Sequence, residues 1–178
     1  ENSNYNLFGA FKFDTSLPLQ KKMENFNHLL KPIFSLRYSP NKNSDLSEND
    51  VLLNYNNVFS LNRIGTSDEV EGGESISLGL EFKRENTDGL SILDFNIANV
   101  IRFNENEKLP IKSKLNKTRS DIFGNLNFNI NEGLRIGYSF SYDRDLEYSN
   151  LEQINLNYGV NNFLTNFSYY TEDNDFGS

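Results

Sequence analysis

The sequence contains no cysteine and no tryptophan, and it has no long uninterrupted apolar run. The missing cysteine excludes disulfide frameworks, thiolate metal sites and thiol catalysis within these 178 residues. No window approaches the roughly 18 consecutive apolar residues that a membrane-spanning helix needs. The start of the chain also lacks the basic and then apolar regions of a secretory signal. These absences exclude helical membrane spans and leave the cellular address open.

Basic residues are also scarce, with 17 Lys and Arg against 25 Asp and Glu and a net charge of −8. A general nucleic-acid role is excluded, because binding to phosphates needs clustered basic side chains. The mean hydropathy is only −0.61, yet aromatic residues make up 13% of the chain. Disordered chains are poor in aromatic residues, so the composition favours a folded protein.

The clearest positive signal is the alternation of apolar and polar residues, which places every second side chain on the same face of an extended strand. Ala98 and Val100 break this pattern, which indicates a β-bulge or a partly covered polar face. Residues 19–30 are ambiguous, because Pro18 and apolar residues at helical spacing fit a short helix about as well as a loop. The predicted strands cover residues 5–13, 33–38, 75–83, 93–103, 122–130, 134–144, 153–160 and 163–170.

The connections between these strands alternate in length. Residues 86–89, 131–133 and 161–162 are rich in Asn, Asp and Gly and predict tight hairpin turns. Longer polar stretches lie between the hairpins, at residues 39–73, 104–120 and 144–150. Short turns at one end and long loops at the other are typical of outer-membrane β-barrels.

The predicted fold class is all-β, an antiparallel transmembrane β-barrel segment of about eight meandering strands. Strands of roughly ten residues match a tilted membrane crossing, and the tyrosines near strand ends would suit the aromatic girdles of such a barrel. A soluble β-sandwich shows the same alternation but turns its apolar face into a dry core. The pattern favours the barrel and leaves the sandwich as an alternative.

Residues 54–73 read NYNNVFSLNRIGTSDEVEGG and run directly into the strand ESISLGLEFKRE. This segment resembles the barrel region of the lipopolysaccharide-assembly family LptD. Residues 28–40, HLLKPIFSLRYSP, are similar to the strand that precedes it in that family. The resemblance covers about 60 residues, and the later hairpins match the family only in general style.

The resemblance implies a portion of an outer-membrane translocon that inserts lipopolysaccharide into the outer leaflet. It also implies an LptE-like lipoprotein plug and an LptA-like periplasmic bridge as partners. We expect residues 1–178 to form part of one barrel domain, as an internal or C-terminal-half piece with further strands in the parent protein. A different porin or receptor barrel, or a soluble sandwich that binds a ligand, are the alternatives.

The residues that match the family segment are the candidate site. We expect them to form an extracellular loop that folds back over or into the lumen, with Arg63 paired to Asp68 or Glu71. An arginine held by carboxylates can pin a loop, and adjacent glycines allow the turn into the next strand. The alternative is an exposed, solvated loop. The candidate residues are Asn57, Phe59, Asn62, Arg63, Asp68, Glu71, Gly72 and Gly73.

Other charged groups are expected to be solvated rather than functional. His28 is the only histidine, and no hydrolase, zinc-protease or P-loop motif accompanies it. We therefore expect no enzyme activity, cofactor or metal. The acidic groups Asp45, Glu48, Asp50 and Glu69, Glu71, Glu74 could hold a divalent cation, and Lys108, Lys112, Lys114, Lys117 and Arg119 could meet lipopolysaccharide phosphates.

Overall fold

The computed structural model describes residues 8–65, 69–112 and 114–172, and in these ranges the chain is all-β without a helix. None of the described residues belongs to a helix that could cross a membrane. The nine strands are β1 (Phe11–Ser16), β2 (Leu19–Lys22), β3 (Phe26–Ser39), β4 (Gly73–Asn86), β5 (Ser91–Arg102), β6 (Arg119–Asn131), β7 (Leu134–Tyr142), β8 (Ser149–Val160) and β9 (Phe163–Glu172).

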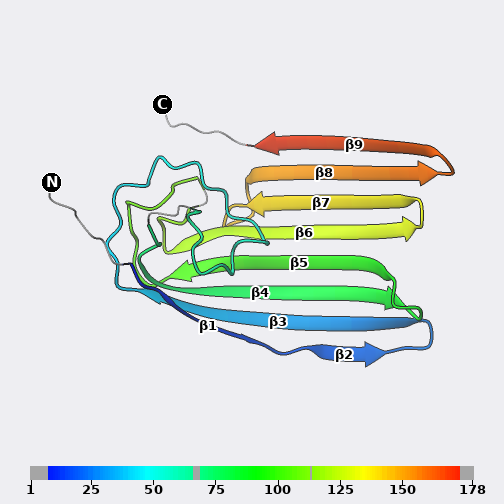
Figure 1. Cartoon of the computed structure of the whole chain (residues 1–178), viewed down its shortest axis with the longest axis horizontal. Coiled ribbons are helices and arrows are strands. Elements are labelled where there is room, and N and C mark those ends of the chain that lie inside the picture. Colours follow the sequence, from blue (N-terminus) through cyan, green and yellow to red (C-terminus); the bar gives the residue numbers. More distant parts are fainter. Residues whose placement is uncertain (1–7, 66–68, 113, 173–178) are drawn as a thin grey trace, which may run out of the picture.

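All nine strands belong to one antiparallel sheet (Figure 1). From β3 to β9 each strand pairs with the next one in the sequence, while β1 and β2 both pair with β3. The sheet is therefore eight strand positions wide, in the meandering order that the sequence predicted. It is open, because β1, β2 and β9 each pair with one neighbour among the described residues.

The edge strand contradicts two expectations from the sequence. Residues 19–30 form neither a helix nor a loop: β2 and the start of β3 pair with each other around a turn at residues 23–25. In the sheet, the backbone N–H and C=O groups of β2 form hydrogen bonds with β3, whereas an isolated helical turn would leave such groups without partners. Strand pairing therefore outweighs the helical spacing of the apolar residues. The strand predicted at residues 5–13 begins only at Phe11, and residues 5–7 lie outside the described part of the chain.

The short and long connections lie at opposite ends of the sheet (Figure 1). The predicted turns at residues 86–89, 131–133 and 161–162 are all present, and left-handed backbone at Gly89 and Asn161 lets the chain reverse. The opposite end carries the three loops at residues 40–72, 103–118 and 143–148. We call these ends the turn end and the loop end.

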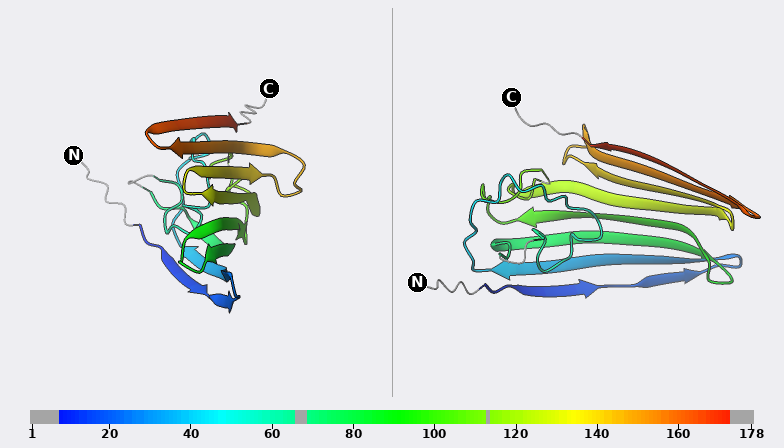
Figure 2. Two further views of the ribbon diagram at one scale, coloured as in Figure 1. Left: turned by 90° about the vertical axis from the view of Figure 1, so that its right-hand side faces the viewer. Right: turned by 45° about the horizontal axis from the view of Figure 1, so that its top comes forward.

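The two faces of the sheet differ in polarity and in how much of each is covered by loops. The cross-strand rows place Leu36 beside Ile76 and Ile101 on one face, and Ser35 beside Ser77 and Val100 on the other. The first face is apolar and bare: Leu36 is 40% exposed, and large exposed apolar side chains continue along it as far as β9. The polar face is covered near the loop end by residues 40–72 and 103–118, which gather over one end of the sheet (Figure 2).

The small apolar core lies on the polar face, between the sheet and the two long loops. Both explanations offered for Ala98 and Val100 hold, because the β5–β6 register shifts between Asn99 and Ile101 and both side chains are buried. The sheet thus presents a local apolar patch on its polar face where the loops pack. The buried apolar residues are Leu46, Leu53, Val58, Ile64, Ala98, Val100, Leu109, Leu115 and Phe123.

Candidate functional site: a buried arginine–glutamate anchor

A group of four charged side chains fastens the first long loop to the polar face of the sheet. Arg63 and Glu71 come from the loop, Arg37 from β3 and Arg102 from β5, and all four are at most 3% exposed. We call this group the arginine–glutamate anchor. Strand pairing brings Arg37 and Arg102 to the same row of the polar face, on either side of Ser75.

Arg63 binds Glu71, one of the two carboxylates that the sequence offered as its partner, through a two-pronged ion pair. Its Nε donates to Glu71 Oε2 at 2.7 Å and its Nη2 to Oε1 at 2.5 Å. The remaining donors reach the sheet: Nη1 donates to Ser77 Oγ at 3.1 Å and Nη2 to Ser75 Oγ at 2.7 Å. One guanidinium therefore joins the loop carboxylate to two polar side chains of β4, in the planar fork geometry that arginine provides.

Arg102 and Arg37 complete the surroundings of Glu71. Arg102 Nη1 donates to Glu71 Oε1, and its Nη2 donates to the carbonyl of Gly72 at 2.7 Å. Arg37 Nε donates to the carbonyl of Leu61 at 2.6 Å, and its Nη2 donates to the backbone oxygen of Glu71. The three arginines thus connect β3, β4 and β5, and both ends of the 61–72 segment, to the side chain and backbone of Glu71.

Burial and charge act in opposite directions on Glu71. Desolvation favours the neutral carboxyl and raises its pKa, but the nearby Arg63, with Arg37 and Arg102 adding to it, reverses this and leaves the pKa of Glu71 below its ordinary value of 4.5. Glu71 is therefore ionised at neutral pH. The group holds three guanidinium cations against this one carboxylate.

The two glycines after Glu71 allow the close approach that the anchor needs. A Cβ atom on Gly72 would lie 2.2 Å from the carbonyl oxygen of Asn41, and one on Gly73 would lie 2.7 Å from Arg102 Nη2. Gly73 also has a φ of 91°, which side-chain-bearing residues rarely adopt. The Gly72 amide donates to Asn43 Oδ1 at 2.8 Å, which joins the two ends of the loop.

The apolar half of the loop packs along the same face. The ring of Phe59 covers Gly79 of β4 so closely that a Cβ there would lie 2.4 Å from it. Beside it, the Tyr55 hydroxyl donates to Glu81 Oε1 at 2.8 Å. Polar side chains shape the loop itself: Asn57 Nδ2 donates to the carbonyl of Leu52 at 2.9 Å, and Asn62 Nδ2 to that of Glu69 at 3.0 Å.

The structure thus places six of the eight candidate residues in one folded loop and Gly73 at the start of β4, and Asp68 lies outside the described residues. Sequence reasoning missed Arg37, Arg102 and Asn43. The alternation of residues along the strands could have placed the two arginines on the polar face, because both occupy polar-face positions beside Ser75. Asn43 gave no such signal, since its contact depends on the path of an irregular loop.

Asp45, Asp50 and Glu69, three of the remaining acidic side chains, have partners within the protein. Asp45 bonds Ser47, Asp50 pairs with Lys112, and Glu69 accepts from Ser44. The described ranges contain no group of three His, Cys, Asp or Glu side chains able to hold a metal ion.

Three lysines of the basic run form ion pairs within the protein, although the sequence suggested a solvated loop. Lys112 bridges Asp50 and Glu172, and Lys114 lies 3.3 Å from Asp121. Lys117 reaches Glu105 at 3.6 Å between exposed side chains. These ion pairs tie the second long loop to the first loop and to the sheet.

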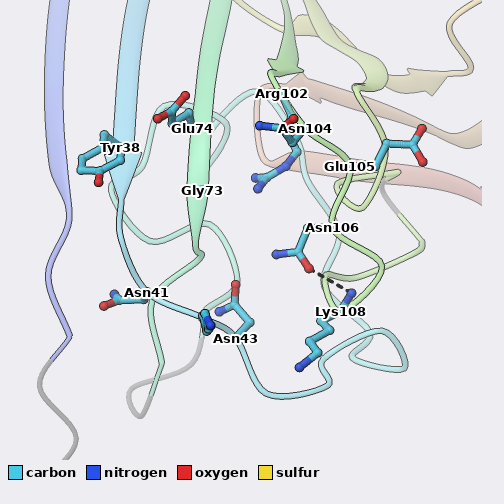
Figure 3. A pocket seen from close by; sticks show the side chains of 11 residues that line it. Tyr38, Asn41, Asn43, Gly73, Glu74, Arg102, Asn104, Glu105, Asn106 and Lys108 are labelled. Carbon is cyan, nitrogen blue, oxygen red and sulfur yellow. Dashed lines mark hydrogen bonds between the residues drawn. The ribbon is translucent and has the colours of Figure 1, made fainter.

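An open polar pocket of about 430 Å³ lies next to the anchor at the loop end. Arg102 and Glu74 reach it from the strands, while Asn106 and Lys108 come from the second loop (Figure 3). The lining mixes both signs of charge with several amides and the ring of Tyr38. Its lining residues are Tyr38, Asn41, Lys42, Asn43, Gly73, Glu74, Arg102, Asn104, Glu105, Asn106 and Lys108.

The fold and the anchor together define a class of protein. It is a single antiparallel β-meander with one bare apolar face and one polar face that its own loops cover near the loop end. The chain belongs to the LptD family, described as LPS transport system D, whose profile matches residues 2–176. This is a family for transport and assembly of lipopolysaccharide rather than a family of enzymes. A comparison with curated proteins found no match.

Proposed function

We propose that these strands form part of the wall of an outer-membrane barrel that delivers lipopolysaccharide to the outer leaflet. The observation that carries the proposal is that loops cover part of the polar face, whereas the apolar face is bare. A soluble sheet buries its apolar face, whereas a membrane barrel turns that face to lipid and its polar face to the lumen. Here Leu36, Leu78 and Phe128 are each about 40% exposed, while Ser75 and Ser77 on the polar face are buried.

In this arrangement residues 1–178 belong to one barrel domain, and further strands pair with the edges at β1, β2 and β9. The polar face lines a hydrated lumen in which the sugars of lipopolysaccharide travel. Residues 40–72 fold into that lumen from the extracellular side, and the anchor holds them against the wall. No covalent chemistry is required, because the protein supplies a route and not a reaction.

The partners follow from the family: lipopolysaccharide as cargo, an LptE-like lipoprotein plug and an LptA-like periplasmic bridge. The pocket beside the anchor suits the cargo chemically, because Lys42 and Lys108 can bind phosphate while its amides can bind sugar hydroxyls. A porin would share the polar lumen, but membership of the LptD family favours lipopolysaccharide over small solutes.

Depletion of the full-length protein in its own cells tests this function. We expect less lipopolysaccharide at the cell surface, measured with an impermeant lipopolysaccharide-binding probe on intact cells, and restoration by a plasmid copy. A porin would give the opposite pattern, in which surface lipopolysaccharide is unchanged and uptake of small solutes falls. A soluble sandwich would be found outside the membrane fraction.

A further inference from the structure

Three basic side chains form a row on the mostly apolar face, at the turn end of the sheet. Lys21 of β2 lies directly opposite His28 of β3, and His28 lies directly opposite Arg84 of β4. Strand parity places all three on the bare face, in line with apolar residues such as Leu30 and Phe82. We call Lys21, His28 and Arg84 the basic row. The ends of β2, β3 and β4 that carry it lie at the turn end of the sheet, on the right in Figure 1.

The basic row has no acidic partner among the described residues. None of its members forms an ion pair there, and Arg84 Nε and His28 Nε2 are enclosed atoms without a hydrogen-bond partner. The polar face behaves differently at the same level: Lys31 pairs with Glu81, and Lys83 lies 3.6 Å from Asp94. Unneutralised cations therefore occur on the face whose side chains are mostly apolar.

Aromatic rings support the row from both sides. The guanidinium of Arg84 lies 3.8 Å from the centre of the Phe26 ring, a cation–π contact. The ring of His28 meets Phe82 edge-on, with 5.8 Å between the ring centres. Such amphipathic side chains place their apolar parts against hydrocarbon and their polar ends in the headgroup layer of a membrane.

We propose that the basic row binds the phosphate of an anionic glycerophospholipid in the leaflet at the turn end. The proposal rests on the proposed function, in which the bare face meets lipid. Short turns of outer-membrane barrels face the periplasm, so the row lies at the phospholipid leaflet and not at the lipopolysaccharide leaflet. An arginine and a lysine supply charge, and the histidine supplies a further N–H donor. Bound lipid phosphate would fix the depth of β2, β3 and β4 in the bilayer.

The test uses the full-length protein in nanodiscs of phosphatidylcholine with a minor fraction of phosphatidylglycerol. Native mass spectrometry counts the lipids that stay bound after the disc is stripped away. We expect wild-type protein to retain phosphatidylglycerol above its supplied fraction. The double variant Lys21→Gln/Arg84→Gln should lose this enrichment by about fivefold for each cation removed.

A matched control also removes two positive charges, one from the residue adjacent to Lys21 and one from the residue adjacent to Arg84. Lys22→Gln/Lys83→Gln changes the opposite, polar face at the same level, and should keep the enrichment. Arg84→Lys, which keeps the charge, should also keep most of it. Arg84→Gln alone serves where the double variant does not insert.

Three results would overturn the proposal: no enrichment in embedded wild-type protein, equal loss in the control, or retention of lipid A in place of phosphatidylglycerol when both are supplied. A protein that never enters the disc would instead contradict the proposed membrane function. The two failures are therefore distinguishable.

Discussion

Replacing Glu71 by alanine is the sharpest perturbation that the anchor offers. Glu71 is fully buried and accepts two hydrogen bonds from Arg63 and one from Arg102, and Arg37 donates to its backbone. The alanine variant leaves three guanidinium groups close together with no described carboxylate between them. Residues 40–72 should then detach from the sheet without unfolding the strands, because strand pairing does not depend on the loop.

The magnitude follows from the burial of the pair. Removing one partner of a buried ion pair costs about 3–5 kcal/mol, because the remaining charge stays desolvated without compensation. If this cost falls on the local opening of the loop, amide exchange there should accelerate by roughly two to four powers of ten. The Val58 amide, which donates within the loop to the carbonyl of Asn54 at 3.0 Å, is a suitable reporter.

Hydrogen exchange of the full-length protein, read by mass spectrometry of peptides, measures this effect. Glu105→Ala is the control, because Glu105 is half exposed and lies 3.6 Å from the equally exposed Lys117. Breaking such a surface pair costs about 0–1 kcal/mol. If Glu71→Ala changes exchange in residues 40–72 no more than Glu105→Ala does, the anchor does not hold the loop.

Three further predictions concern the same loop and its surroundings. Glu71 has a lowered pKa when folded, so its stabilising effect is present above its ordinary value of 4.5 and is lost as pH falls through the lower, folded value; the protection of the loop amides, corrected for the intrinsic exchange rate at each pH, should therefore fall with acid in wild type and less in Glu71→Gln. Gly72→Ala should cost about 1–3 kcal/mol by denaturant unfolding, because its Cβ meets the backbone oxygen of Asn41, whereas Gly9→Ala meets nothing within 4 Å and should be nearly neutral. Leu109→Ala, at a fully buried position between loop and sheet, should cost about 2–5 kcal/mol in the same assay.

Most of the sheet could be predicted from the sequence because strand periodicity is local information. Alternation in residues 75–83 and 134–144 determined both strand and face, and Asn–Gly chemistry at residues 86–89 and 131–133 identified the turns. The edge was harder. Apolar residues between Leu19 and Leu30 fit a helical spacing, and only pairing with β3 decides against it.

The anchor was predictable only in part. Arg63 and Glu71 are eight residues apart in one segment, so their pairing could be proposed from charge and proximity. Arg37 and Arg102 reach Glu71 over 34 and 31 residues of sequence, and their contact depends on strand register combined with the path of the loop. The sequence predicted a loop that folds over or into the lumen, but not that the loop buries Ser75 and Ser77, because polar-face residues of a barrel are ordinarily hydrated.

The most direct test of the central claim is to find which face of the sheet meets lipid. Ile154 and Asn155 are neighbours in the middle of β8 on opposite faces, and Ile154 is 37% exposed. Each is replaced singly by cysteine in the full-length protein, and outer-membrane vesicles are treated with a lipid-soluble or a water-soluble maleimide. We predict that Ile154→Cys reacts with the lipid-soluble reagent alone and Asn155→Cys with the water-soluble one alone. If Ile154→Cys reacts equally from water, or if neither position meets lipid, the apolar face is not a membrane surface and the barrel assignment is wrong.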